Sequence, residues 1–136
     1  MKVLSLRQPW GTLLFHGKDV ENRSWQTKYR GELLIHCSSK PDVNLYQCSQ
    51  SGLFTREQSK FIFGEGIITR LDPVLIMTNL PVSSIIGMVT LVDCVRDSKS
   101  IWAEKDCWHW ILEDPILFDE PIENVKGKLN LWEYDI

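Results

Sequence analysis

The sequence predicts an α+β fold, a small mixed β-barrel with short helices beside the barrel, built from one domain over residues 1–136. Short apolar segments recur along the chain and are joined by long irregular connections, which is typical of small barrels. Strand and helix patterns do not alternate regularly, which disfavours a doubly wound parallel sheet. A chain of 136 residues with 43% hydrophobic residues can bury a single core without disulfides.

The N-terminal third contains the clearest local signals. Residues 2–6 carry Val and Leu in a short alternating run that predicts a strand. A proline and helically spaced apolar residues predict a short helix over 9–16, ending at Gly17. Residues 20–25 form a short extended or looped stretch, and the apolar run over 31–38 predicts a strand of the barrel wall.

The middle of the chain is less regular. Residues 42–63 contain spaced Leu and Phe residues with a Ser-Gly interruption, which predicts one or two short helices. Residues 64–82 contain two glycines and two prolines as breakers, so we expect irregular structure there.

The C-terminal part is predicted to be mostly strand. Residues 85–95 give the strongest strand signal, and Gly87 within them indicates a bulge or a close approach of the backbone. Two further strands are predicted over 108–112 and 116–118, separated by Glu-Asp-Pro. A Lys-Gly-Lys turn precedes a last strand over 131–134.

Composition indicates a cytoplasmic protein that makes no membrane contact. The longest apolar runs are a few residues, and the N-terminus has no apolar signal region. The four cysteines have no paired spacing, so we expect free thiols. The net charge of −3 hides an asymmetry: residues 1–40 hold seven Lys or Arg against three acids, and residues 41–136 hold eight against fifteen. This pattern favours a local anion site over a uniformly basic surface.

Residues suited to binding or proton transfer gather in the basic N-terminal part. Lys18 and Glu21 are three positions apart and can pair across one turn, each holding the charge of the other. Arginines at 23 and 30 offer planar donors that suit phosphate, and tryptophans at 10 and 25 offer faces for base stacking. Each feature also has a structural interpretation, as a surface ion pair or a core aromatic residue.

Five segments together resemble the ASCH domain family. They are residues 5–10 (SLRQPW), 17–25 (GKDVENRSW), 29–36 (YRGELLIH), 87–94 (GMVTLVDC) and 128–132 (KLNLW). The Gly-x-Lys-x-x-Glu-x-Arg core is moderately specific alone and strong in this combination.

The resemblance implies a PUA-like barrel with a cleft beside the first helix, and RNA, a nucleotide or a modified nucleoside as the partner. In that cleft Gln8 would bond a base edge, Glu21 would orient Lys18, and Trp25 would stack on a base. The cations would contact phosphate or a polar base group. The ligand-binding residues expected from the resemblance are Gln8, Pro9, Trp10, Lys18, Glu21, Arg23, Trp25 and Arg30.

The resemblance leaves an enzyme and an adaptor as alternatives. One family branch deacetylates acetylcytidine with a Lys and a Thr, and another is a ribonuclease. Lys18 matches the lysine, but Glu21 stands where the Thr would be, so Lys18 and Glu21 would be the catalytic pair of a hydrolase. The third alternative is a protein-interaction adaptor, whose acidic body would face a basic partner.

No cofactor or metal is expected. The Gly64-Glu65-Gly66 stretch lacks the Lys-Ser/Thr of a phosphate loop. Cysteine and histidine occur at 36–37, 48 and 107–109, without compact zinc spacing.

Overall fold

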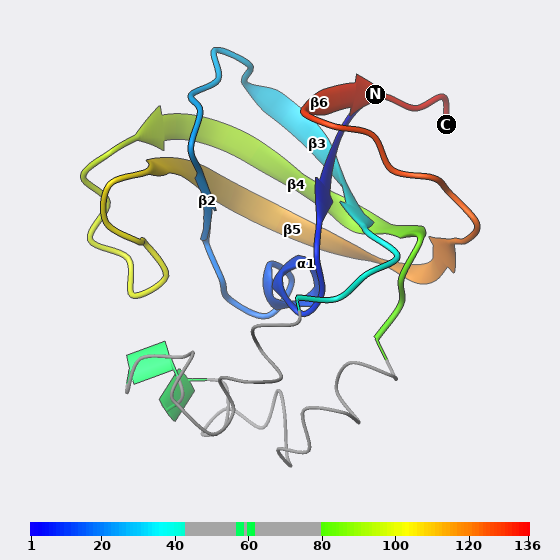
Figure 1. Ribbon diagram of the computed structural model, residues 1–136, viewed down its shortest axis with the longest axis horizontal. Helices are drawn as coiled ribbons and strands as arrows, with labels where there is room; N and C mark the ends of the chain where they lie inside the picture. Colours follow the sequence, from blue (N-terminus) through cyan, green and yellow to red (C-terminus); the bar gives the residue numbers. More distant parts are fainter. Residues whose placement is uncertain (43–56, 59, 62–79) are drawn as a thin grey trace.

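The computed structural model describes residues 1–42, 57, 58, 60, 61 and 80–136. Its described part consists mainly of one curled six-stranded sheet with a short helix at one end (Figure 1). The elements in chain order are β1 (Lys2–Leu6), α1 (Trp10–Leu13), β2 (Val20–Arg23), β3 (Gly31–Cys37), β4 (Ser84–Val95), β5 (Trp108–Ile122) and β6 (Leu131–Glu133).

The sheet is mixed and forms a half-barrel. Its strand order is β2-β5-β4-β3-β1-β6, with β1 and β3 parallel and the other neighbours antiparallel. Because β6 pairs with β1, the two ends of the chain lie close together (Figure 1). The Met1 amine donates to the carbonyl of Tyr134 over 2.8 Å. The predicted α+β class with a mixed barrel-like sheet is therefore confirmed.

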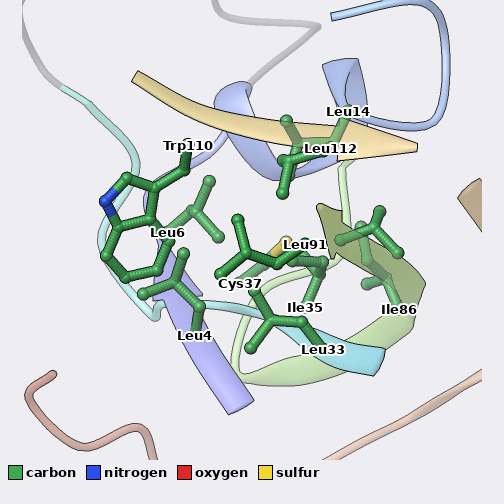
Figure 2. Close-up of a cluster of buried hydrophobic side chains, with 11 residues drawn as sticks. Leu4, Leu6, Leu14, Leu33, Ile35, Cys37, Ile86, Leu91, Trp110 and Leu112 are labelled. Atoms are coloured by element: carbon green, nitrogen blue, oxygen red, sulfur yellow. The ribbon is translucent and has the colours of Figure 1, made fainter. Parts of the chain in front are cut away.

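The main core fills the inside of the curl. Alternate residues of β1 and β3 point inward because successive side chains in a strand face opposite sides. They meet residues of β4 and β5, and Leu14 directly after α1 (Figure 2). The buried members are Leu4, Leu6, Leu14, Leu33, Ile35, Cys37, Ile86, Val89, Leu91, Trp110 and Leu112.

A second apolar cluster covers the other face of the same strands. Val3 and Leu34 point outward from β1 and β3 and pack with Ile85, Val125 and Trp132. The backbone around Val125 therefore closes this face of the sheet, and it also approaches the candidate site described below.

The helix is shorter than the 9–16 segment predicted. The α-helical turn covers Trp10–Leu13 and is followed by turns through residue 17. The amides of Phe15 and His16 bond to carbonyls three residues back, which tightens the chain before it leaves the helix. Gly17 has φ +105°, so the predicted glycine stop is confirmed.

The two strands predicted over 108–112 and 116–118 are in fact one strand, β5. The Glu-Asp-Pro interruption is absorbed by a bulge: Met88 pairs with Ile116 and Thr90 with Glu113, so β5 carries one extra residue here. Asp114 takes φ 50°, a conformation that Asp tolerates better than most residues.

The other predicted elements compare as follows. The stretch over 20–25 contains a strand, β2, which pairs with β5, and the last strand is shorter than the 131–134 predicted. Residues 57, 58, 60 and 61 are helical, within the helical region predicted over 42–63. The rest of that region, most of 64–82 and Cys48 lie outside the described residues. The other three cysteines are free.

Gly87 lies where another strand backbone comes close, as predicted. A Cβ atom at this position would stand 2.4 Å from the carbonyl oxygen of Ile116 and 2.6 Å from the Phe15 ring. We expect Gly87→Ala to lower the free energy of unfolding by about 1–3 kcal/mol, because β4 and β5 must separate to admit the methyl group. Chemical denaturation measures this. Val92→Ala, at an exposed position of the same strand, is the control and should change stability by less than about 0.5 kcal/mol. Equal effects of the two substitutions would contradict this account.

Candidate functional site

A buried carboxylate organises the predicted site. Lys18 follows the turn that ends α1, and β2 then presents Glu21 and Arg23 on one side, since residues two apart in a strand share a face. Lys18 Nζ lies 3.0 Å from Glu21 Oε1, and Arg23 Nη2 lies 3.0 Å from Glu21 Oε2. One carboxylate therefore neutralises two cations.

Both cations make a second bond that ties this cluster to the fold. Lys18 Nζ donates to the carbonyl of Val20 over 2.6 Å. Arg23 Nη2 donates to the carbonyl of Ser5 on β1 over 2.9 Å. The Nε atom of Arg23 is buried and has no hydrogen-bond partner in the described part of the chain. Arg23 thus reaches from β2 to β1 with part of its donor capacity unused.

The charge state of Glu21 follows from its neighbours. Burial alone would raise the pKa of its carboxyl group, but Lys18 and Arg23 outweigh burial through their charges and hydrogen bonds, so the pKa falls below 4.5. Glu21 is consequently ionised at neutral pH and is a weak proton acceptor. This environment suits a residue that orients cations better than one that transfers protons.

Trp10 connects the charged cluster to an open groove. Lys18 Nζ lies 5.6 Å from the centroid of the Trp10 ring, within cation–π range. The indole nitrogen of Trp10 donates to Asp42 over 2.9 Å. The half-buried ring lines a groove of about 940 Å³, which Glu21 and Arg23 also line.

Several parts of the chain contribute cations to this groove. Besides Arg23, the described lining residues include Arg7 after β1, Lys40 after β3, and Lys126 and Lys128 before β6, all four exposed. The lining carboxylates among the described residues are Glu21 and Asp42. Glu21 is already paired with two cations, so the accessible charge of the groove is mainly positive.

The structure brings together only part of the predicted set. Trp10, Glu21 and Arg23 line the groove, and Lys18 lies directly behind Glu21 with 3% of its surface exposed. Gln8 and Pro9 are buried beneath α1. The side chain of Gln8 bonds to Thr12 and to the carbonyl of Pro81.

Trp25 and Arg30 lie apart from the described lining of the groove. The Trp25 ring packs edge-on against Trp110, with centroids 4.7 Å apart. Arg30 is exposed and donates to the carbonyls of Thr27 and Tyr29. Their ligand-binding roles remain predictions.

Lys40, Lys126 and Lys128 lie outside the set of residues that the sequence predicts for the site, and Arg7 belongs to the SLRQPW segment but not to that set. The Lys-Gly-Lys pattern at 126–128 predicts only a turn. Its place beside Arg23 follows from the pairing of β6 with β1, which local sequence patterns do not encode.

Comparisons with known proteins agree with the resemblance seen in the sequence. A family model described as the ASCH domain matches residues 4–124. The chain is 30% identical over 142 residues to activating signal cointegrator 1 of Homo sapiens and 31% identical over 146 residues to that of Mus musculus. Each alignment covers 97% of this chain and 22% of the relative, so the chain spans about a fifth of the length of the curated relatives it matches. With a family match over most of its length and a sheet of the expected kind, the chain belongs to the ASCH domain family.

Proposed function

We propose that the chain is a nucleic-acid-binding module that holds RNA or a nucleotide in the groove beside α1. The observation that carries this proposal is the lining of the groove: five cationic side chains from separate parts of the chain converge on a space of about 940 Å³ that also exposes Trp10. Cations contribute phosphate contacts, and an aromatic face contributes base stacking. The resemblance to RNA-associated ASCH proteins supports the same function.

Each described group has a role in this proposal. Arg7, Lys40, Lys126 and Lys128 are exposed and meet backbone phosphates. Arg23 is held by Glu21 and by the carbonyl of Ser5, so its guanidinium is oriented before the ligand arrives. A donor that is already fixed loses little entropy on binding.

Trp10 replaces Trp25 as the main stacking candidate, because it is the tryptophan that lines the groove among the described residues. The proposed ligand is a single-stranded segment or a nucleotide, since a base must be unstacked from its neighbours to lie on an indole ring.

None of the described helices is long and apolar enough to span a membrane.

The hydrolase alternative would place Lys18 and Glu21 at the reacting atoms. Binding is favoured over hydrolysis because the groups that would react are already engaged. Lys18 Nζ donates to the Val20 carbonyl and to Glu21, and both oxygens of Glu21 contact cations. The adaptor alternative would place a basic protein partner on the acidic body of the chain, and the experiment below includes it as an outcome.

Phosphate contacts at the groove predict a salt-dependent affinity. Binding of a single-stranded RNA of about ten nucleotides should weaken as salt rises, with a log–log slope of about −0.7 for each phosphate contact. Replacing both Lys126 and Lys128 with Ala should weaken binding and make the slope shallower by about 1 to 2. Fluorescence anisotropy at several salt concentrations measures both quantities.

Lys28→Ala and Lys105→Ala are the matched controls. Both lysines are exposed, and neither is among the described groove residues, so affinity and slope should stay close to those of the unmodified chain. Salt-independent RNA binding, or equal losses in the control variants, would contradict the proposed site. Binding of a basic peptide with no binding of RNA or nucleotide would favour the adaptor.

Glu21→Gln separates a binding module from an enzyme. The substitution keeps the shape of the side chain, so a binding module should lose only about 1–2 kcal/mol of affinity, the scale of a charged hydrogen bond. In an enzyme that transfers protons through Glu21, turnover of acetylated nucleosides or RNA should fall by about a hundredfold or more while affinity survives. Lys18→Ala should weaken ligand binding under either function, because the Glu21 carboxylate then loses one of its two cations.

A melting curve of each variant is the control for this comparison, because removing one partner of a buried ion pair costs about 3–5 kcal/mol of stability. Affinities are therefore compared at a temperature where all variants are folded. If both substitutions leave binding and turnover intact, the functional site lies elsewhere.

A further inference from the structure

The segment 124–130, here called the lysine loop, has a buried residue at 125 and a half-buried one at 127 among exposed residues. Val125 is buried in the second apolar cluster, whereas Lys126 and Lys128 are exposed. Its two ends, Asn124 and Asn130, take φ of 59° and 60°. All seven residues line the groove. The loop thus presents its lysines to the groove from a backbone that is fixed to the sheet.

The loop is fixed through a buried histidine of β3. His36 Nε2 lies 2.7 Å from the carbonyl oxygen of Val125, and His36 Nδ1 lies 2.9 Å from Ser5 Oγ. The indole nitrogen of Trp132 donates to Ser5 Oγ over 3.1 Å. The amide of Val125 adds a bond to the carbonyl of Ser83.

With a neutral imidazole these bonds have one consistent set of directions. A carbonyl oxygen accepts, so Nε2 carries the proton of the imidazole and donates to Val125. Nδ1 is then the acceptor, and the Ser5 hydroxyl donates to it while accepting from Trp132. The neutral imidazole therefore carries its proton on Nε2. Protonation would turn Nδ1 into a donor, oblige the Ser5 hydroxyl to turn, and place a positive charge in a buried position.

The lysine loop also packs directly on this pair. A Cβ atom at Gly127 would stand 2.7 Å from His36 Cε1 and 2.9 Å from Ser5 Oγ. The loop backbone therefore covers the imidazole, and only a glycine allows it to come this close. A change in the protonation of His36 therefore acts directly on Val125 and Gly127, which lie against the imidazole.

We infer that His36 is a positioning residue for the groove: its neutral imidazole holds the lysine loop in place, and its protonation releases the loop and weakens binding of an anionic ligand. This inference rests on the proposed function for its ligand, a single-stranded RNA. The bond to Val125 and the burial of the imidazole beneath Gly127 carry the inference for the loop itself.

No carboxylate among the described residues pairs with His36 to stabilise its protonated form. On β1 it meets the neutral Ser5, and on β4 it pairs with Ile85. The lysine loop adds only positive side chains, and β6 contributes the Trp132 ring, edge-on with centroids 5.5 Å apart. Arg23 bonds to the Ser5 carbonyl, and Glu21 is already neutralised by Arg23 and Lys18.

Burial lowers the pKa of His36 below 6.5, and this outweighs the bond to Val125, which raises it. The folded state therefore resists protonation, and its stability is complete above about pH 6.5 and declines as the pH falls further. We therefore expect binding to weaken as the pH falls, which is the opposite of the usual behaviour of a basic groove. A basic groove with an exposed histidine binds RNA more tightly in acid, whereas this groove should bind it less tightly.

The experiment measures binding of a single-stranded RNA of about ten nucleotides from about pH 7.5 down to about pH 5, at constant salt. The unmodified chain should lose affinity by up to about tenfold per pH unit once His36 is protonated, because only the neutral form is competent to bind. His36→Gln keeps an N–H donor for Val125 and does not titrate, so its profile should lack this acid loss. Unchanged or tighter binding of the unmodified chain in acid, or the same acid loss in His36→Gln, would overturn the inference.

His109→Gln is the matched control. His109 is also buried and also holds a loop, since Nε2 bonds to the carbonyl of Glu104 and Nδ1 accepts from the Ser98 amide. It is not among the described groove residues, so the variant should keep the acid loss of the unmodified chain.

A second measurement needs neither a variant nor a ligand. Nitrogen NMR shifts of the unmodified chain should show the Nε2-protonated tautomer of His36 at neutral pH. Amide hydrogen exchange over 125–130 should accelerate as His36 titrates, ahead of exchange in β3 and β4. An Nδ1-protonated tautomer, or loop amides that stay protected while His36 titrates, would overturn the inference. Absence of RNA binding at neutral pH together with the expected NMR behaviour would overturn the proposed function alone.

Discussion

The site depends on the pairing of the Glu21 carboxylate with Lys18 and Arg23. Charged side chains are rarely fully buried unless they are paired, and this single carboxylate allows Lys18 and Arg23 to lie behind and beside the groove. Through its partners it links three elements: the turn after α1, strand β2, and the backbone of β1 at Ser5. Its negative charge is neutralised by Lys18 and Arg23. The exposed cations at the groove therefore remain available to an external anion.

Two loops are held in place by neutral histidines rather than by ion pairs. His36 fastens the lysine loop, and His109 fastens the segment containing Ser98 and Glu104, each by donating from Nε2 to a carbonyl. Both imidazoles come from strands in the middle of the sheet. Connections with little regular structure thereby acquire fixed positions from the rigid part of the molecule, as is common for loops that carry function.

The sequence predicted the elements whose patterns are local. The runs that became β1, β3 and β4 are apolar and uninterrupted by strong breakers, and Gly87 indicated the close backbone approach found there. The continuity of β5 was missed because Asp114-Pro115 resembles a strand end, and only the register with β4 shows that a bulge accommodates it.

The candidate site likewise has one part that local sequence predicts and another part that it does not. The pairing of Lys18 with Glu21 follows from their spacing of three residues. The bond from Arg23 to the Ser5 carbonyl and the approach of Lys126 and Lys128 depend on β1 pairing with β6. That pairing joins opposite ends of the chain, and no window of local sequence contains both partners.

The pattern of burial along the lysine loop has a consequence for how such a domain can change over evolutionary time. Positions 125 and 127 are constrained by the apolar cluster and by the imidazole beneath them, whereas the side chains at 126, 128 and 129 face solvent. Substitutions at the exposed positions therefore alter what the rim of the groove attracts with little effect on folding. Leu129, 89% exposed between Lys128 and Asn130, is one such position. Preference for a ligand can drift there, one residue at a time, while the sheet that supports it stays under separate selection.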